Sequence, residues 1–427
     1  MIVKYNEEPY DVILIMMRVD PNDTSRFLPE ANFFLNAEYI SKMIIGNDLI
    51  DPVPFIGIDY IDRANLGVER FPPDGRSILF LSMTNEHMQN DKINHFFIVD
   101  DIKVIEKGVD QNLLKISGRS SMHSILQSCT EFSSGEDSPD KHVEATKIAK
   151  DILETVNFPV DRSGMETDKR IHYVTPANHA VQKSVNDLLE YAISESKGMF
   201  FLVYNMIRNN CRVLSMSELF ETFDPMTVPN EDVPNYNIFS IPGREGILSQ
   251  YTIANDMVST NNVLGSSTYN IVSESVRNNF SYLDRQWTQD PFSYERYMKT
   301  IPGLPKSIVD EHQFIPQKVP RIIGDRLKYF EELPNMEYDR VYNKHFIMMT
   351  QMENIQFTTV NHMLRDVGQL ILMYTNNAVD AQRFGGFWMI SRIHHVFTSG
   401  KATSNITAIR SMKLEGPLVS DQPDQGA

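Results

Sequence analysis

Among the adjacent ionisable residues of this chain, three pairs are considered as candidates for acid–base or metal chemistry. They are His394 with His395, Asp100 with Asp101, and Glu331 with Glu332. Neighbouring side chains on a β-strand point to opposite faces, so two adjacent histidines on a strand cannot chelate one metal ion together. We interpret both histidines as structural residues and both carboxylate pairs as solvated surface charge.

Sequence signatures of enzymes are absent. The chain contains no Gly-x-Gly-x-x-Gly, no phosphate-binding Gly-x-x-x-x-Gly-Lys, no Gly-x-Ser-x-Gly and no His-Glu-x-x-His. Its two cysteines, Cys129 and Cys211, are too few for a disulfide framework or a metal site built from cysteines. The sequence therefore predicts no catalytic residue, no cofactor and no metal, and it favours a structural or binding protein.

Composition excludes further classes. The chain has 427 residues, of which 41% are hydrophobic, and a formal net charge of −16. At about 100–200 residues per domain, this length predicts two to four domains with hydrophobic cores. No run of about 18 apolar residues could cross a bilayer, and an acidic chain is poorly suited to bind nucleic acid or anionic lipid. We therefore expect no stable membrane association.

Most of the acidity lies in the first part of the chain. Residues 1–240 carry 37 acidic and 22 basic side chains, whereas residues 241–427 carry 19 and 18. An acidic surface can serve solubility alone. If the negative charge has a further role, we expect that role to lie in residues 1–240.

The elements that must position these residues are mainly strands. Residues 1–120 contain short apolar or alternating runs separated by turn-forming residues, which predicts a small antiparallel barrel or sandwich. The predicted strands are 12–17, 77–82, 96–99 and 113–117.

Residues 121–240 show a mixed α/β pattern. Two helices and a hairpin are expected: 140–157, 181–193, and 200–204 paired with 211–215. Ser138 followed by Pro139 is typical of a helix N-terminus, since a capping serine and a proline in the first turn both favour it.

Strands return after residue 240, interrupted by one segment of different character. Residues 281–340 contain six prolines and five tyrosines without a sustained period, which is typical of a surface extension. We expect a second strand-rich domain from residues 241–280 plus 341–413, and a flexible tail over 414–427. The predicted elements of this second domain are a short helix over 338–351 and strands over 355–360, 369–374, 387–397 and 402–413. Both faces of the strand 387–397 are largely apolar, which predicts that both are covered.

The order of these segments resembles the trimeric baseplate hub protein of contractile-tailed phages, which is related to the hub part of type VI secretion spike proteins. The strongest stretch is the C-terminal hairpin, where Phe387, Ile393 and His394 match aromatic, hydrophobic and histidine positions of the family. Gln250 lies in a stretch that resembles the return into the family's second barrel. Gly368 lies in a matching turn, although valine precedes it where the family has proline.

The resemblance implies an α+β, mainly β fold with two tube-like antiparallel β-barrel domains (1–120, and 241–280 plus 341–413), a mixed α/β middle domain (121–240) and a long insertion (281–340). Three subunits of a homotrimer would present six similar barrels in a pseudo-sixfold ring. Such a ring joins the hexameric tail tube protein to the trimeric central spike protein and contacts other baseplate proteins. The expected location is the tail baseplate of the virion, after assembly in the host cytoplasm.

In such a hub DNA is only a passing cargo, and an acidic channel wall would keep its phosphates from adhering. Because most of the acidity lies in residues 1–240 and the second barrel is nearly neutral, this acidity is predicted to come mainly from the N-terminal barrel. Two alternatives stay open. One is a hub or tip protein of a non-contractile tail or of a contractile secretion machine, and the other is a cell-wall hydrolase, which no paired carboxylate or metal-ligand spacing supports.

Overall fold

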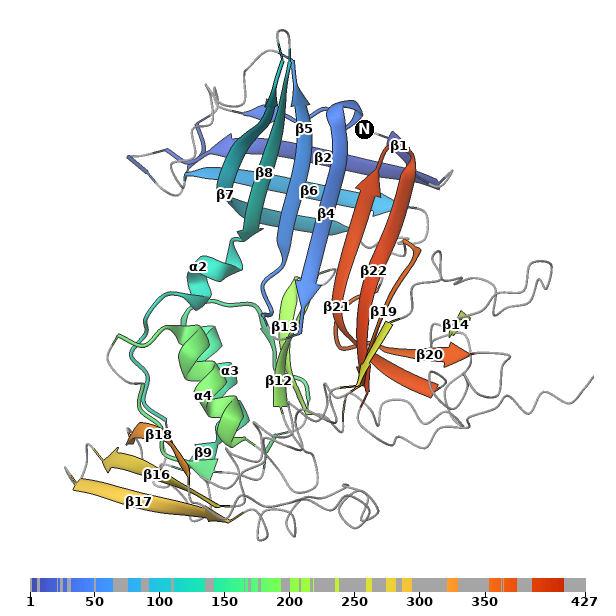
Figure 1. The fold of residues 1–427 in the computed structure, drawn as a ribbon. Helices are drawn as coiled ribbons and strands as arrows, with labels where there is room; N and C mark the ends of the chain where they lie inside the picture. The colour runs from blue at the N-terminus through green and yellow to red at the C-terminus, as the bar shows by residue number, and fades with distance from the viewer. Residues whose placement is uncertain are drawn as a thin grey trace, which may run out of the picture.

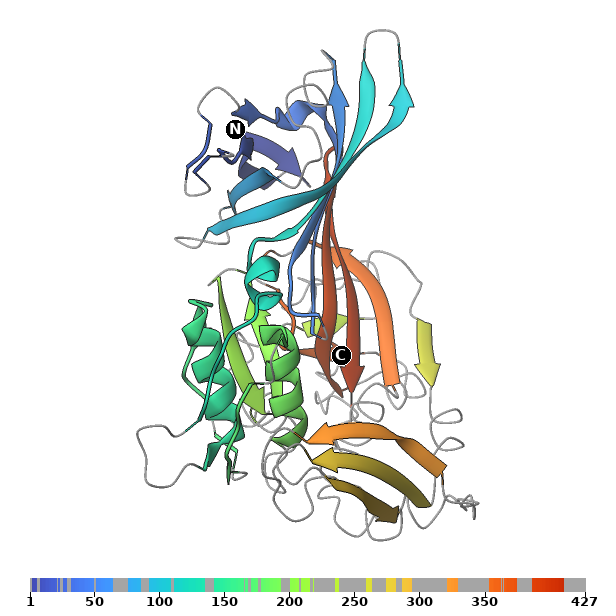
Figure 2. The same cartoon turned by 90° about the vertical axis from the view of Figure 1, so that its left-hand side faces the viewer.

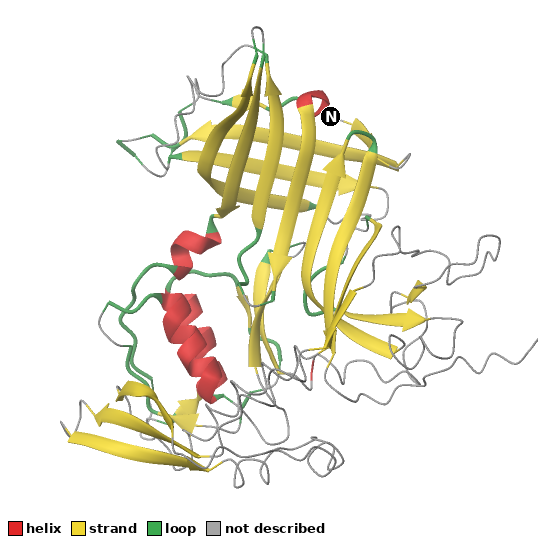
Figure 3. Ribbon diagram, viewed as in Figure 1, coloured by secondary structure: helices red, strands yellow, loops and turns green. Residues whose placement is uncertain are grey.

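The structure, a computed structural model, is built mainly from β-strands with few helices (Figure 1, Figure 3). It describes residues 2–218 apart from short gaps, the longest of which is 64–75, and then the segments 235–237, 259–262, 274–281, 286–293, 321–328, 353–374 with short gaps, and 386–410. The α+β, mainly β fold class predicted from the sequence is confirmed. Within the described residues, no helix is long and apolar enough to span a membrane.

The first 120 residues fold into two crossed layers of antiparallel strands (Figure 1, Figure 2). Their elements are β1 (Ile2–Tyr5), β2 (Glu8–Arg18), β3 (Phe33–Phe34), the short 3-10 helix η2 (Ala37–Tyr39), β4 (Ile40–Asp48), β5 (Phe55–Asp62), β6 (Ser77–Asn85), β7 (Ile93–Lys107) and β8 (Asn112–Ser120). The long strand β7 belongs to both layers, because its first part pairs with β6 and its later part with β8. Buried and more exposed residues alternate along β6 and β8, so one face of each layer lies in a shared core.

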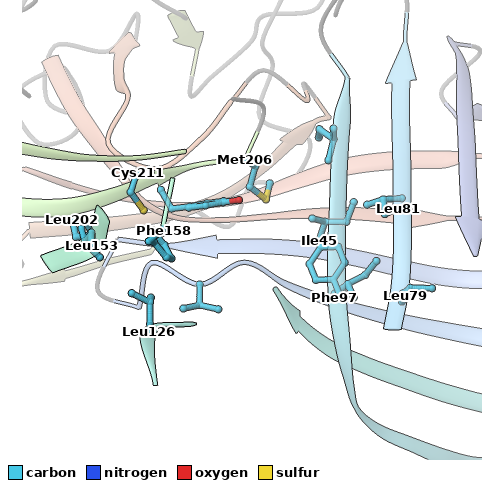
Figure 4. Packing of buried hydrophobic residues seen from close by; sticks show 14 of the residues in the cluster. Ile45, Leu79, Leu81, Phe97, Leu126, Leu153, Phe158, Leu202, Met206 and Cys211 are labelled. Atoms are coloured by element: carbon cyan, nitrogen blue, oxygen red, sulfur yellow. The ribbon is translucent and has the colours of Figure 1, made fainter. Parts of the chain in front are cut away.

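This core continues into the middle of the chain (Figure 4). Ile45, Leu79 and Phe97 from the strands belong to the same buried cluster as Leu153 and Phe158 from the middle unit. Each fully buried side chain of this size contributes about 1.5–3 kcal/mol relative to exposure. The N-terminal layers and the middle unit are therefore held together by apolar packing.

The middle unit contains the α-helices that the structure describes. Its elements are α2 (Met122–Leu126), β9 (Val143–Glu144), α3 (Ala145–Thr155), β10 (Val160–Asp161), β11 (Arg170–Ile171), α4 (Val181–Tyr191), β12 (Phe200–Asn205) and β13 (Asn210–Ser215). The hairpin β12–β13 was predicted correctly, and Asn209 in its turn has φ 51°, a left-handed conformation that asparagine tolerates. Helix α4 begins at the predicted residue, Val181.

Helix α3 begins later than the sequence predicted, at Ala145 rather than residue 140. Val143 and Glu144 pair with Ile171 and Arg170 of β11, and this pairing holds the backbone extended up to the helix. The expected cap at Ser138 lies outside the described residues. The long-range strand pairing thus overrides a local helix signal.

Strands near the two ends of the chain pair directly with each other. The antiparallel pair β4–β21 places His394 opposite Gly46. The C-terminal elements of this sheet are β21 (Gly386–Thr398), β22 (Lys401–Arg410), β19 (Glu353–Val360), β15 (Ser259–Asn262), β20 (Leu370–Tyr374) and β14 (Asn235–Asn237). The two strand-rich regions therefore share one continuous 14-stranded sheet. Their domain boundaries stay a prediction.

The sequence predicted that side chains along β21 alternate regularly between its two faces. In the structure they do not. Its buried residues are Trp388, Met389 and Ile390, followed by Ile393, His395 and Phe397. A β-bulge at Ser391 separates the two groups, and the extra residue moves the following side chains to the opposite face. The prediction that both faces are covered is correct before the bulge and wrong just after it, where Arg392 is exposed.

The segment 281–340 contains regular structure that its composition did not predict. β16 (Glu274–Ser281) pairs with β17 (Gln286–Ser293) on one side and with β18 (Arg321–Lys328) on the other. The three strands form a separate small sheet. The sequence did not predict these strands, and the assignment of 281–340 as an insertion or extension stays a prediction. The expected helix over 338–351 and the expected tail over 414–427 lie outside the described residues.

Gly118 on β8 leaves no room for a side chain. A Cβ atom there would lie 2.8 Å from the carbonyl oxygen of Ile98 on β7, which moves only if the two strands separate. We expect Gly118→Ala to lower the free energy of unfolding by about 1–3 kcal/mol in urea denaturation. Gly57→Ala on β5 is the matched control, because a Cβ there meets no atom within 4 Å. Equal losses in the two variants would contradict this explanation.

Candidate functional site

The two adjacent histidines lie on opposite sides of β21. His395 is fully buried, whereas His394 is partly exposed and its ring meets Phe55 edge to face, with centroids 5.3 Å apart. Within the described residues, no three His, Cys, Asp or Glu side chains lie close enough to hold a metal ion. The two rings serve packing and hydrogen bonding at the seam between the N-terminal and C-terminal strands.

The adjacent carboxylates Asp100 and Asp101 lie on β7 and make surface ion pairs. Asp101 contacts Lys103 at 2.5 Å, and Asp100 contacts Arg119 at 3.5 Å. Such exposed pairs contribute little to stability, about 0–1 kcal/mol each. These contacts agree with the interpretation as solvated charge. Glu331 and Glu332 lie outside the described residues.

The residues selected from the family resemblance occupy different parts of the C-terminal region. Phe387 pairs in register with Leu372 of β20, and Ile393 is fully buried on β21. Gly368 has φ 77°, a left-handed conformation that favours glycine, so the turn forms although valine precedes it. Gln250 lies outside the described residues. The structure brings Ile393, His394 and Gly368 into one sheet region.

The centre of this region is a carboxylate that the sequence analysis missed. Asp366 is buried in the turn before β20, and its side chain accepts three hydrogen bonds. The donors are Asn47 Nδ2 at 2.7 Å, Met206 N at 2.7 Å and Val367 N at 2.8 Å. These donors come from β4, from the end of β12 and from the turn itself. The carboxylate therefore joins the N-terminal layers, the middle unit and the C-terminal strands.

The groups around Asp366 extend the network into the N-terminal core. Asn47 Nδ2 also donates to the Tyr204 carbonyl at 2.9 Å, and Nε2 of His95 lies 2.8 Å from the Met206 carbonyl. All these side chains are buried, so their polar atoms depend on one another for partners. We call Asn47, His95, Met206 and Asp366 the polar junction.

Burial dominates the electrostatics of the polar junction. It raises the pKa of Asp366 to about 6, although the hydrogen bonds from Met206, Asn47 and Val367 act in the opposite direction. Burial also lowers the pKa of His95, against the hydrogen bond with Met206. Both shifts follow from the cost of a charge in a low-dielectric interior.

A second buried polar cluster lies on the same sheet. His395 Nδ1 lies 2.7 Å from Asn361 Oδ1 and 3.2 Å from Ser404 Oγ. Asn361 Nδ2 lies 3.4 Å from the hydroxyl of Tyr10, and the Tyr10 ring packs edge to face on Phe397. Burial lowers the pKa of His395 to about 4, so this ring is neutral at pH 7. The cluster links β2 to the C-terminal hairpin.

Neither cluster has the arrangement of a catalytic site. In the part of the chain that the structure describes, Asp366 accepts from three N–H donors, and His395 contacts an amide and a hydroxyl. The polar junction and the His395 cluster both connect segments that are distant in the sequence. No pattern in the sequence identified Asp366: the Asp-Val-Gly turn signal predicts a turn, but not the burial of its carboxylate.

The outward side of β4, β5 and β8 carries charges of both signs. Cross-strand neighbours on β4, β5 and β8 include Lys42, Asp59 and Lys115 in one row. Arg392 on β21 pairs with Asp48 on β4 at 2.6 Å. This face is suited to contact with water.

Comparison with known proteins identifies the fold. No protein-family model and no curated protein matches the sequence. The structure is similar to a tail protein from Neisseria meningitidis, with a TM-score of 0.54 and 9% identity over 94% of this chain and 96% of that one. It is also similar to the 43 kDa tail protein of prophage MuSo2 from Shewanella oneidensis, with a TM-score of 0.50 and 8% identity over 93% and 98%.

A component of the type VI secretion system from E. coli has a TM-score of 0.44 and 8% identity, over 88% of this chain and 74% of that one. The chain shares the fold of the two tail proteins over nearly its whole length. The resemblance stated from the sequence is thus confirmed at the level of fold.

Proposed function

We propose that this chain is a structural baseplate hub of a phage tail. Three copies form a pseudo-sixfold ring that joins the hexameric tail tube protein to the trimeric central spike protein. Other baseplate proteins surround the ring, and the complex belongs to the tail of the virion. DNA passes through the ring as cargo.

The pairing of β4 with β21 is the observation that carries this proposal. It places strand-rich regions from both ends of one chain in a single sheet, so that each subunit contributes two neighbouring units to a wall. Three such subunits provide six units, which matches a sixfold partner while the assembly itself keeps threefold symmetry. The tail-protein fold supports the same assignment.

The channel wall of this ring is proposed to be acidic, because phosphates are repelled by carboxylates. The mixed face of β4, β5 and β8 does not supply such acidity, since it carries Lys42, Lys115 and Arg119 beside Asp59. The carboxylates must then come from other parts of residues 1–240. A map of the trimer with this mixed face lining the channel would contradict the acidic wall.

The proposed hub has no catalytic role. The buried ionisable groups of the polar junction bind backbone and amide groups, and their function is to connect segments. A zymogram on purified peptidoglycan tests this directly. We expect no clearing at the position of the chain, and a cleared band would favour a cell-wall hydrolase instead.

Mass measurement tests the assembly. We expect native mass spectrometry of the purified chain, alone or with its spike, to show three copies of the 49.1 kDa subunit. Averaged electron micrographs should then show a ring with a central channel, seen along a threefold axis. A chain that stays monomeric both alone and with the spike would contradict the hub.

A further inference from the structure

The two strand-rich regions of the chain repeat one arrangement of strands. Neighbouring strands run in the order β6-β7-β8-β5-β4 in the N-terminal region and β20-β21-β22-β19-β15 in the C-terminal region. Every pair within the two sets is antiparallel. The strands of each set also follow one another along the chain in the same order. In this repeat β4 corresponds to β15, and β7 corresponds to β21.

A β-bulge lies at the same place in β7 and in β21. In β7 the residues up to Ile98 pair with β6, and the bulge falls between Val99 and Asp101. In β21 the residues up to Met389 pair with β20, and the bulge falls between Ile390 and Arg392. The remainder of each strand ends at Lys107 and at Thr398, so the two remainders are equally long. The bulge marks where each strand leaves its first partner.

Beyond the bulge the two strands differ in one respect. β21 exchanges β20 for β4 and pairs with it from Arg392 to Thr398 (Figure 1). The equivalent part of β7, Asp101–Lys107, pairs with β8 on one edge, and no strand among the described residues pairs with its other edge. We call this free edge the β7 edge. It belongs to a hairpin that extends beyond the layers (Figure 2), and its side chains from Lys103 to Lys107 are exposed.

Strand β15 ends the continuous sheet on the opposite side. It pairs with β19, and within the described part of the chain its other edge has no strand partner. Its counterpart β4 uses the equivalent edge to pair with β21. An unpaired edge presents backbone N–H and C=O groups that can pair with another strand. Each copy therefore carries two different free edges whose equivalents are joined inside the same chain.

Charge permits these two edges to meet although the chain is acidic. The β7 edge is balanced, with two acidic and two basic residues: Asp101, Lys103, Glu106 and Lys107. β15 contains only uncharged residues: Ser259, Thr260, Asn261 and Asn262. No net repulsion opposes a contact between segments of this composition.

We propose that the β7 edge of one copy pairs with β15 of the next copy around the ring. The pairing is antiparallel, like that of β4 with β21, and it brings the N-terminal region of one copy beside the C-terminal region of its neighbour. The two edges differ, so the contact is heterologous, and a threefold rotation closes the ring. This inference rests on the proposed hub function and specifies the strands that join its subunits.

The register of this contact follows from the pairing of β4 with β21. There, His394 stands opposite Gly46, and His395 stands opposite Ile45. Counting from the bulges and across the paired strands gives the equivalents of these residues in the same order: Lys103, Asn261, Val104 and Thr260. We therefore expect Lys103 of one copy opposite Asn261 of the next, and Val104 opposite Thr260.

Paired cysteines test the contact and its register. One chain carries Lys103→Cys with Asn261→Cys, and a second carries Val104→Cys with Thr260→Cys. Both also carry Cys129→Ser, because Cys129 is an exposed free thiol. Two adjacent pairs are used because side chains approach most closely at the non-hydrogen-bonded positions of an antiparallel ladder. After mild oxidation of the assembled chain, with its spike where the trimer requires it, we expect one pair to give a covalent trimer on a non-reducing gel.

A matched control places the first cysteine elsewhere on the same strand. Asn94 is also an exposed residue of β7, but it lies before the bulge, where β7 pairs with β6. Asn94→Cys with Asn261→Cys, again with Cys129→Ser, should give no covalent oligomer. Equal cross-linking in this control would contradict pairing at the β7 edge.

Mixing two single-cysteine chains tests whether the contact is heterologous. We expect a chain with Lys103→Cys and a chain with Asn261→Cys, assembled together, to give covalent dimers, and neither chain alone to give any. The pair at Val104 and Thr260 is divided in the same way. Covalent dimers from one single-cysteine chain alone would show that like edges meet, which contradicts this contact.

The outcomes separate this inference from the hub proposal. If the chain is trimeric and neither cysteine pair cross-links its copies, the hub stands and the proposed pairing of the β7 edge with β15 is wrong. A wild-type chain that is monomeric with and without the spike contradicts the hub itself.

Discussion

Replacing Asp366 with alanine is expected to lower the free energy of unfolding by about 2–4 kcal/mol at pH 7. The change leaves the buried N–H groups of Met206 and Val367 without their acceptor and removes one partner of Asn47. Each unsatisfied buried donor costs about 1–3 kcal/mol, and the removal of a buried charge offsets part of that cost. Urea denaturation followed by circular dichroism measures the difference.

Asp48→Ala is the matched control for Asp366→Ala. Asp48 also lies between the N-terminal and C-terminal strands, but it pairs with Arg392, whose side chain is 52% exposed. Loss of such a pair should cost at most about 1 kcal/mol. If Asp366→Ala costs no more than Asp48→Ala, Asp366 does not hold the polar junction together.

Asp366→Asn separates hydrogen bonding from charge. An asparagine keeps one acceptor oxygen but places an NH2 group where the second carboxylate oxygen was. In either orientation this NH2 faces a donor, Met206 N or Asn47 Nδ2. The asparagine variant should therefore remain less stable than the wild type at pH 7, although its side chain carries no charge.

His395→Gln is expected to improve acid stability. The folded pKa of His395 is about 4, below the ordinary value of 6.5, so the unfolded chain binds the proton more tightly. Stability from this group is present above pH 6.5 and is lost as the pH falls towards 4. At 1.36 kcal/mol for each tenfold difference in proton affinity, the loss reaches about 3 kcal/mol near pH 4.

The measurement compares urea unfolding of the two proteins between pH 7 and pH 4. The wild type should lose stability relative to His395→Gln across this range. His394→Gln is the control on the opposite side of the same strand. Burial lowers the pKa of His394 as well, but this ring is only partly buried, so its contribution is smaller. If His395→Gln loses stability between pH 7 and pH 4 as steeply as the wild type, His395 is not a buried neutral ring.

Asp366 acts in the opposite direction over nearly the same range. Its folded pKa of about 6 exceeds its ordinary value of 3.8, so the folded state binds the proton more tightly. Acidification from pH 6 to pH 4 therefore stabilises the fold through Asp366 while it destabilises the fold through His395 and His95. The asparagine variant at 366 should for this reason lose stability with acid more steeply than the wild type.

Local patterns in the sequence predicted about half of the described strands and missed the long strands β4 and β5. The runs beginning near Val12, Ser77 and Leu113 became β2, β6 and β8, and the hairpin β12–β13 was found with its turn. In each case the signal is carried by neighbouring residues: alternation sets the buried face, and turn-forming residues separate the strands. The absence of the common enzyme motifs is likewise a property of neighbouring residues and can be read from the sequence.

Local patterns failed where a distant partner decides the conformation. β11 keeps Val143 and Glu144 extended and so delays α3, and pairing with β16 makes strands of two segments within 281–340. The bulge at Ser391 reverses the buried face of β21, because it follows from pairing with β22 rather than from the order of side chains. None of these partners is adjacent in sequence.

The sequence by itself determined the mainly β character of the chain, the positions of about half of the described strands and the uneven distribution of charge. Only the tertiary structure decided that both ends share one sheet and that Asp366 joins β4 to the middle unit. Asn47 and Asp366 are separated by 319 positions, and their contact depends on the pairing of β4 with β21. Periodicity records which face of an element is buried, but not which element covers it. The polar junction therefore became visible only once the strands were paired.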